Sequence, residues 1–203
     1  MPHKFADIMF TDTVKSIQTD YGSRKMYTRM EEGTADYNNL IGPNEAAFIS
    51  ARDSLYMATI NETGWPYVQH RGGPLGFVKI LDEKTLAMPD FRGNRQYVSV
   101  GNLTKDDRVS LFFMDYPNKT RLKLLGRVEL VGLDQPKIIE KLQMPDYRGH
   151  IERGYIIKVE AFDWNCPQHI TQRYTVPDIE KSVASLQDRI IELETELSRL
   201  KPQ

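Results

Sequence analysis

Two short segments combine arginine with glycine, a pairing suited to holding an anion. In the first, Arg71 is followed directly by Gly72 and Gly73. Glycine lets backbone amides approach a ligand closely, and the planar guanidinium of arginine matches the geometry of phosphate oxygens. Strand alternation would place Gln69 and Arg71 on one face. Taken alone, the segment is more often an ordinary turn that follows a strand and carries a solvated arginine.

The second segment runs from Asp90 to Tyr97 and contains Arg92, Gly93 and Arg95. Its pattern predicts the end of a strand, a glycine and then the start of a helix. Unpaired amides and the helix dipole favour an anion at such a start. An Asn-capped helix with exposed arginines explains the segment equally well.

A third basic pair, Arg121 and Lys123, shares one face of a predicted strand. The sequence does not show whether the three basic elements converge on one site. His70 and Cys166 are the remaining candidates for a chemical role. For His70 the stronger reading is a strand residue bonded to backbone, and for Cys166 a small buried packing residue.

Composition and missing motifs narrow the class of protein. The chain has 203 residues with 27 Lys+Arg against 28 Asp+Glu, so no broad positive field favours nucleic acid. We find no Walker loop, no Gly-x-Ser-x-Gly and no run of ~20 apolar residues for a membrane span. A single cysteine and four scattered histidines argue against disulfides and a metal site. The N-terminus lacks the apolar core of a signal peptide, so a cytoplasmic location is the default expectation.

The elements that would position these residues are mainly strands. Residues 5–32 predict a helix or two, and Pro43-Asn44-Glu45 predicts the start of another. Short helices are also expected at 94–103 and 135–144. Several short strands about ten residues apart suggest a barrel or sandwich. The expected strands are 55–60, 65–70, 77–81, 85–88, 109–114, 122–131 and 155–162.

The C-terminal segment has a different periodicity. Its apolar residues are spaced 4, 3, 4, 3, 4, 3, which is a heptad pattern; they are Ile179, Val183, Leu186, Ile190, Leu193, Leu197 and Leu200. Mostly β-branched residues at a with mostly Leu at d favour a parallel two-stranded coil. The g-to-e′ pairs Arg189–Glu194 and Glu196–Lys201 would attract. Packing of this stripe on the chain's own barrel is the alternative, since three heptads are marginal alone.

Several motifs, taken together and in order, resemble the pyridoxamine 5′-phosphate oxidase-like family of FMN-binding split barrels. The resemblance covers roughly residues 40 to 175. The motifs are Asp53-Ser54-Leu55-Tyr56-Met57-Ala58-Thr59, Gly64-Trp65-Pro66 through Arg71-Gly72-Gly73-Pro74 and Gly76-Phe77-Val78, Arg92-Gly93-Asn94-Arg95-Gln96, Gly101-Asn102-Leu103, Arg121-x-Lys123-x-x-Gly126, and Trp164-Asn165-Cys166-Pro167-Gln168-His169-Ile170.

The resemblance implies a mainly β (α+β) fold, a six-stranded Greek-key split barrel with peripheral helices. It implies a homodimer that holds FMN between protomers. The chain would divide into a helical segment (1–42) on the barrel, the barrel (43–176) and a coiled-coil-like helix (177–203). The residues carried over as cofactor-binding are Gln69, His70, Arg71, Gly72, Phe91, Asn94, Arg95, Gln96, Asn102, Arg121, Lys123, Asn165 and Gln168.

Two departures from the family pattern bear on the reaction. The substrate-binding Arg-x-His type segment of true pyridoxamine-phosphate oxidases is not reproduced, and their Ser-x-Lys type motif is replaced by Gly93-Asn94-Arg95. Vitamin B6 oxidation is therefore not expected, whereas FMN binding is. The first hypothesis is an FMN-dependent oxidoreductase of unassigned substrate. The alternatives are a non-catalytic flavin carrier or sensor, and a protein that binds haem or a deazaflavin in the same groove.

Overall fold

The computed structural model describes residues 3–32 and 38–200, apart from the side chains of Asn165 and Leu200. Contacts divide the described chain into two compact units. One is drawn from residues 1–115 and 120–166, and the other from residues 116–119 and 167–203. The three-part division expected from the sequence stays a prediction.

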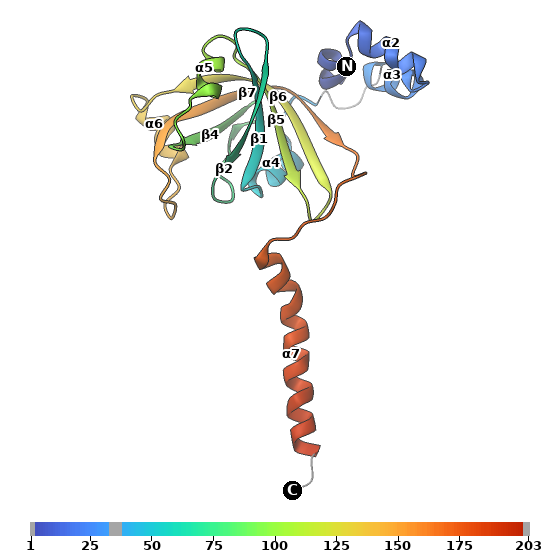
Figure 1. Ribbon diagram of the computed structural model, residues 1–203, viewed down its shortest axis with the longest axis vertical. Coiled ribbons are helices and arrows are strands. Elements are labelled where there is room, and N and C mark those ends of the chain that lie inside the picture. The colour runs from blue at the N-terminus through green and yellow to red at the C-terminus, as the bar shows by residue number, and fades with distance from the viewer. Residues whose placement is uncertain (1–2, 33–37, 201–203) are drawn as a thin grey trace. The chain divides into compact units, whose positions relative to one another are not determined.

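The first unit is built on one antiparallel sheet of seven strands in the order β2-β1-β5-β6-β7-β4-β3. The sheet curves into a barrel-like wall (Figure 1). Its edge strands β2 and β3 form no ladder with each other in the described residues, so the barrel is open. The strands are β1 Ser54–Ile60, β2 Pro66–Gly72, β3 Lys79–Asp82, β4 Thr85–Phe91, β5 Arg108–Asp115, β6 Thr120–Val131 and β7 Ile151–Asn165.

This architecture confirms the mainly β split-barrel prediction, with one correction. The resemblance implies six strands, whereas the sheet has seven. The seventh arises because the short strand β3 pairs with β4 as a hairpin and extends the sheet beyond β4.

The interior of the barrel follows from strand alternation. Leu55 and Met57 on β1 point inward and are fully buried, as are Leu111 and Phe113 on β5. The intervening side chains face outward, because successive residues of a strand alternate between the two faces of the sheet. Strand β6 requires a glycine at position 126, where it passes close to the backbone of β7. A Cβ at Gly126 would lie 2.8 Å from the backbone oxygen of Lys158, at a bulge between β6 and β7.

Short helices surround the sheet. Residues 5–32 were expected to form a helix or two and form three, because Thr11 caps the second and Gly22, at φ +74°, follows its end. The Phe5 side chain is buried, and its ring lies 4.5 Å from Lys123 Nζ. The helices of this unit are α1 Lys4–Met9, α2 Asp12–Asp20, α3 Arg24–Glu32, α4 Pro43–Ser50, α5 Val98–Leu103 and α6 Pro136–Leu142.

One predicted helix start is wrong. The sequence places it at Asn94, whereas α5 begins at Val98. Arg95 and Tyr97 adopt φ of 60° and 55°, in the left-handed region that non-glycine residues rarely occupy. These two residues therefore keep residues 94–97 out of the helix and form a separate loop.

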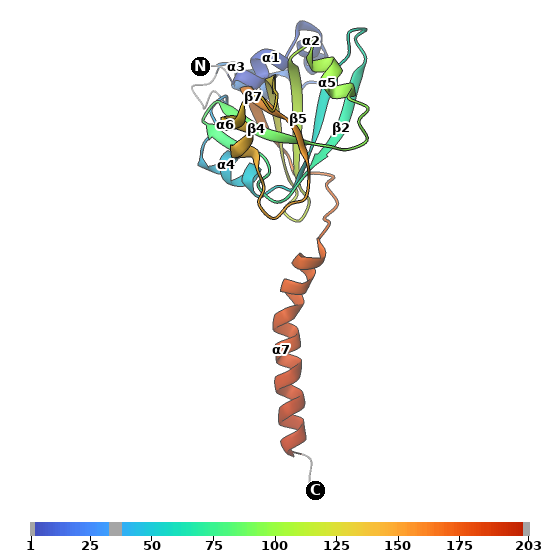
Figure 2. The same cartoon turned by 90° about the vertical axis from the view of Figure 1, so that its left-hand side faces the viewer.

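The second unit contains α7, Val176–Leu200, an uninterrupted helix (Figure 2). Thr175 and Asp178 cap its start reciprocally. The Thr175 hydroxyl accepts from the Asp178 amide at 3.3 Å, and the Asp178 carboxylate accepts from the Thr175 amide at 2.9 Å. Among the described residues, no helix is both long and apolar enough to cross a membrane.

Candidate functional site

A polar cavity of about 200 Å³ opens where β2, the end of β4 and the start of β7 meet the 92–97 loop and α5. Eight of its eleven lining residues carry side chains that can donate or accept hydrogen bonds. The lining residues are Gln69, Arg71, Asp90, Phe91, Gly93, Asn94, Arg95, Tyr97, Ser99, Val100 and Glu152.

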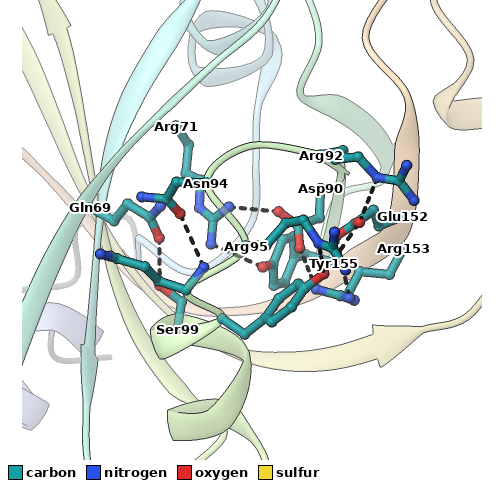
Figure 3. A network of polar contacts seen from close by, with 12 residues as sticks. Gln69, Arg71, Asp90, Arg92, Asn94, Arg95, Ser99, Glu152, Arg153 and Tyr155 are labelled. Atoms are coloured by element: carbon teal, nitrogen blue, oxygen red, sulfur yellow. Dashed lines mark hydrogen bonds and ion pairs between the residues drawn. The ribbon is translucent and has the colours of Figure 1, made fainter.

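A buried carboxylate held by two arginines forms the centre of the site (Figure 3). Arg71 Nη1 lies 2.6 Å from one oxygen of Asp90, and Arg153 Nη1 lies 2.8 Å from the other. Arg71 also donates to the Tyr155 hydroxyl at 3.0 Å. The Asp90 side chain is only 8% exposed, so its charge is compensated almost entirely by these two guanidinium groups.

Strand register brings these residues together. In the β4–β7 ladder, Asp90 lies opposite Arg153 and Met88 lies opposite Tyr155. The end of β2 reaches the same place because the chain at Gly73 passes close to Phe91. A Cβ at Gly73 would lie 2.9 Å from Phe77 and 3.1 Å from the Phe91 ring, so any larger residue would force one of these side chains to shift.

Burial sets the protonation of the tyrosine in this network. The pKa of Tyr155 is raised well above its usual value, chiefly because the side chain is desolvated. Tyr155 therefore stays a neutral phenol even at a pH at which an exposed tyrosine would ionise. The buried Nε of Arg71 has no hydrogen-bond partner within the described part of the chain, and so is a donor left over for a ligand or water.

The 92–97 loop carries a second charged group. Arg92 Nε donates to Glu152 Oε1 at 2.9 Å, and this bond is the main reason that the pKa of Glu152 is lowered. Arg95 Nε donates to the Tyr97 hydroxyl at 3.3 Å, which raises the pKa of Arg95 further. The guanidinium of Arg153 lies 5.1 Å from the centre of the Tyr97 ring.

The network has an excess of positive charge. It contains four arginines (Arg71, Arg92, Arg95 and Arg153) and two carboxylates (Asp90 and Glu152), hence 4 − 2 = +2. A phosphate monoester carries about −1.5 to −2 near neutral pH. Two residues of the loop also adopt strained left-handed backbone conformations, a feature that is concentrated at functional sites.

Five of the residues carried over from the resemblance line this cavity: Gln69, Arg71, Phe91, Asn94 and Arg95. Gln96 is the next residue of the loop, and its backbone N–H donates to Asn94 Oδ1 at 3.2 Å. His70 and Gly72 have the opposite strand parity to Arg71. The His70 ring instead meets Tyr56 edge-on, 5.7 Å between ring centres, on the outer face of the sheet.

Arg121 and Lys123 also lie on the outer face. Lys123 pairs across the sheet with Phe112, which pairs with Tyr56, which pairs with His70. Residues directly opposite each other in a ladder share a face. Lys123 is bound by Asp163 at 2.8 Å. A single chain therefore does not bring this basic pair into the cavity with Arg71, so the expected three-part basic cluster is not formed within one protomer.

The remaining carried-over residues lie elsewhere. Asn102 lies on the buried face of α5 and donates to Thr59 Oγ1 at 2.9 Å. Gln168 is exposed in the second unit. Asn165 is the last residue of β7, and its side chain is outside the described residues. In the described chain, no group of three or more His, Cys, Asp or Glu residues is placed to hold a metal ion.

The sequence reading missed the part of the site that the start of β7 contributes. Glu152, Arg153 and Tyr155 escaped notice because the strand was predicted to start at Tyr155, four residues late. Glu152 and Arg153 interrupt the apolar pattern at this point, so the sequence carried no clear strand signal before Tyr155. Ser99 was also missed; its hydroxyl donates to Gln69 Oε1 at 2.9 Å and fixes that amide at the cavity wall.

Comparison with known proteins places the barrel in a family. A family model described as pyridoxamine 5′-phosphate oxidase matches residues 41–154, more than half of the chain. The chain belongs to the pyridoxamine 5′-phosphate oxidase family. This membership confirms the resemblance on which the sequence reading rested. The match spans β1 to β6 and the start of β7, and it includes every residue that lines the cavity.

Of three solved structures compared with this chain, the first supports the fold. A HupZ variant from Group A Streptococcus is 16% identical, with a TM-score of 0.50 over 62% of this chain and 100% of that chain. A putative pyridoxamine 5′-phosphate oxidase from Lactobacillus delbrueckii is 16% identical, with a TM-score of 0.47 over 62% and 94%. An FMN-binding protein from Syntrophomonas wolfei is 12% identical, with a TM-score of 0.43 over 76% and 96%. No curated protein matches the chain.

Proposed function

We propose that this protein binds FMN with the phosphate in the cavity at Arg71 and Arg95, and that it is an FMN-dependent oxidoreductase of unassigned substrate. The observation that carries the proposal is the charge of the site. The polar network at the cavity carries an excess charge of +2 when Arg92 and Arg153, which do not line the cavity themselves, are counted with the lining residues. This excess is opposite in sign and similar in magnitude to the charge of a phosphate monoester. Membership of the family supports the same ligand, because FMN is the cofactor that the resemblance implies.

The exposed groups of the loop would make the direct phosphate contacts. Arg95 and Asn94 are exposed at the cavity wall, and the Arg95 side chain donates a hydrogen bond to the Tyr97 hydroxyl. Arg71 contributes its positive charge from deeper in the site, because its guanidinium is already bound to Asp90 and Tyr155. Gln69, held by Ser99, presents an amide to the adjoining part of the ligand.

The cavity is too small for the whole cofactor. Sites that enclose drug-sized ligands measure about 300–1,000 Å³, against about 200 Å³ here. The phosphate and the adjoining ribityl chain would fill it, and the flavin ring would lie outside. A second copy of the chain is proposed to cover the ring.

The outer face of the sheet is the surface on which we place that second copy. Tyr56, Ile60 and Val68 are exposed there, on β1 and β2. Arg121 and Lys123 share the same face, so a homodimer through it would put this basic pair at the interface. FMN between protomers would then be held by basic residues that one chain alone keeps apart.

Bound FMN would supply the redox chemistry, and the chain would supply binding, orientation and electrostatics. Arg71, Arg95, Asn94 and Gln69 would anchor the phosphate end and so fix where the ring lies. Tyr155, which stays protonated, keeps the Arg71 guanidinium in place and carries no charge of its own.

The absorbance spectrum of the freshly purified protein tests the proposal, with identification of the cofactor released on denaturation. FMN bands and released FMN are expected. A colourless protein whose melting temperature does not rise with added FMN would contradict it, and a Soret band would indicate haem instead. Reduction of the bound flavin by NAD(P)H with turnover on an acceptor separates an oxidoreductase from a carrier or sensor.

A further inference from the structure

Helix α7 carries an apolar stripe that is exposed within the described residues. Ile179, Val183, Leu186, Ile190 and Leu193 recur at heptad spacing and all remain exposed. We propose that this stripe pairs with the same stripe of a second copy, forming a parallel two-stranded coiled coil. This interaction is separate from FMN binding.

The residues at the contact positions favour two parallel strands. Val183 and Ile190 occupy consecutive a positions, whereas Leu186 and Leu193 occupy d positions. β-branched residues at a with leucine at d fit the side-chain geometry of parallel dimers. A helix of 25 residues gives a contact about 37 Å long at 1.5 Å per residue.

Charges beside the stripe select the parallel orientation. In a parallel pair, Arg189 at g faces Glu194 at e of the partner helix, so opposite charges meet. In an antiparallel pair with full overlap, g faces g and e faces e. Arg189 would then face its own copy, and Glu194 would face Glu180, so like charges would meet in every charged pair of the described helix. Lys201, the partner expected for Glu196, lies outside the described residues.

A short coil needs help from its context, since about three heptads are marginal alone. Two copies that also meet through their barrels would raise the effective concentration of α7 into the millimolar range. A parallel coil has its two-fold axis along the helices, so it can share that axis with a two-fold barrel dimer.

The chain offers a matched pair of variants. Ile190 occupies an a position and Ile191 the neighbouring b position, and their exposed fractions are 54% and 61%. Sedimentation velocity over a dilution series of the full-length protein gives the dissociation constant of assembly. Ile190→Asp should weaken assembly at least about tenfold, because each chain would bury an unpaired charge. Ile191→Asp should leave it unchanged. Equal effects of both variants, or none from Ile190→Asp, would overturn the proposal and favour packing of the stripe on its own barrel.

Glu194→Arg tests the orientation by the sign of its effect. In a parallel coil the introduced guanidinium would face Arg189 of the partner helix, so assembly should weaken several-fold. In an antiparallel coil it would face Glu180, so assembly would strengthen. Strengthening, or no change, would overturn the parallel arrangement. At protein concentrations high enough to keep every variant assembled, FMN affinity should equal that of the wild-type protein, because α7 does not line the proposed cavity.

Discussion

Replacing Asp90 by asparagine should destabilise the barrel by about 3 kcal/mol. The substitution keeps the shape of the side chain and removes a charge that compensates two guanidinium groups. Arg71 and Arg153 would then face an amide whose NH₂ group opposes one of their own donors. Breaking a buried ion pair costs about 3–5 kcal/mol. The low end applies because the Arg71 and Arg153 side chains keep 14% and 21% of their exposure.

Urea denaturation followed by the fluorescence of Trp164 measures this loss. Trp164 reports on the barrel, because it packs edge-on against Phe48 and donates to Glu45 at 2.9 Å. With a slope of about 1–3 kcal/mol per molar urea, the midpoint should fall by at least about 1 M. Asp107→Asn is the control, since Asp107 and its partner Arg127 are 48% and 51% exposed and a surface pair contributes about 0–1 kcal/mol.

An anion should partly restore the Asp90→Asn variant. The excess charge of the network rises from +2 to 4 − 1 = +3, so inorganic phosphate should stabilise this variant more than the wild-type protein. A loss below about 1 kcal/mol in phosphate-free buffer would refute the reasoning, because it would mean that water compensates the two arginines as well as Asp90 does.

Three further predictions concern other parts of the molecule. Gly73→Ala should lower stability by roughly 1–3 kcal/mol, since its Cβ would lie 2.9 Å from Phe77; an unchanged melting temperature would contradict this. The pKa of Asp106 is lowered to about 2, chiefly by a hydrogen bond from Arg108, so its stabilising effect is present above the ordinary value of 3.8 and is lost as pH falls through about 2. NMR should find this carboxyl mostly ionised near pH 3 and more protonated at that pH in Arg108→Ala, which keeps only the backbone hydrogen bond from residue 108. Ending the chain after Pro177 should leave FMN affinity within about twofold of wild type, as α7 has no part in the proposed site; a large loss would show that it does.

Strand alternation predicted most of the barrel because its core strands are amphipathic. β1 and β5 alternate buried and outward-facing residues along nearly their whole length, so their presence and inward faces followed from the sequence. The start of β7 was not recognised, since Glu152 and Arg153 break the apolar pattern. Their charges are compensated by Arg92 and Asp90, which are distant in sequence.

The candidate site was only partly predictable for the same reason. Gln69, Arg71, Asn94 and Arg95 belong to short local motifs, and these residues do line one cavity. Strand parity alone could not show that Arg121 and Lys123 lie on the opposite face from Arg71. That fact depends on the pairing of four strands. The left-handed backbone of Arg95 and Tyr97 is likewise opposed to local preference, so it must be imposed by tertiary contacts.

A comparison of FMN with riboflavin tests the phosphate site most directly, because the two ligands differ only by the phosphate. Quenching of flavin fluorescence gives both dissociation constants in the wild-type protein and in Arg95→Ala. Arg95 is the residue to change, since Arg71 also stabilises Asp90. The phosphate should tighten binding at least about tenfold in the wild type, and Arg95→Ala should weaken FMN by about 1.5–3 kcal/mol while leaving riboflavin unchanged. Equal affinities for FMN and riboflavin in the wild-type protein would contradict the account.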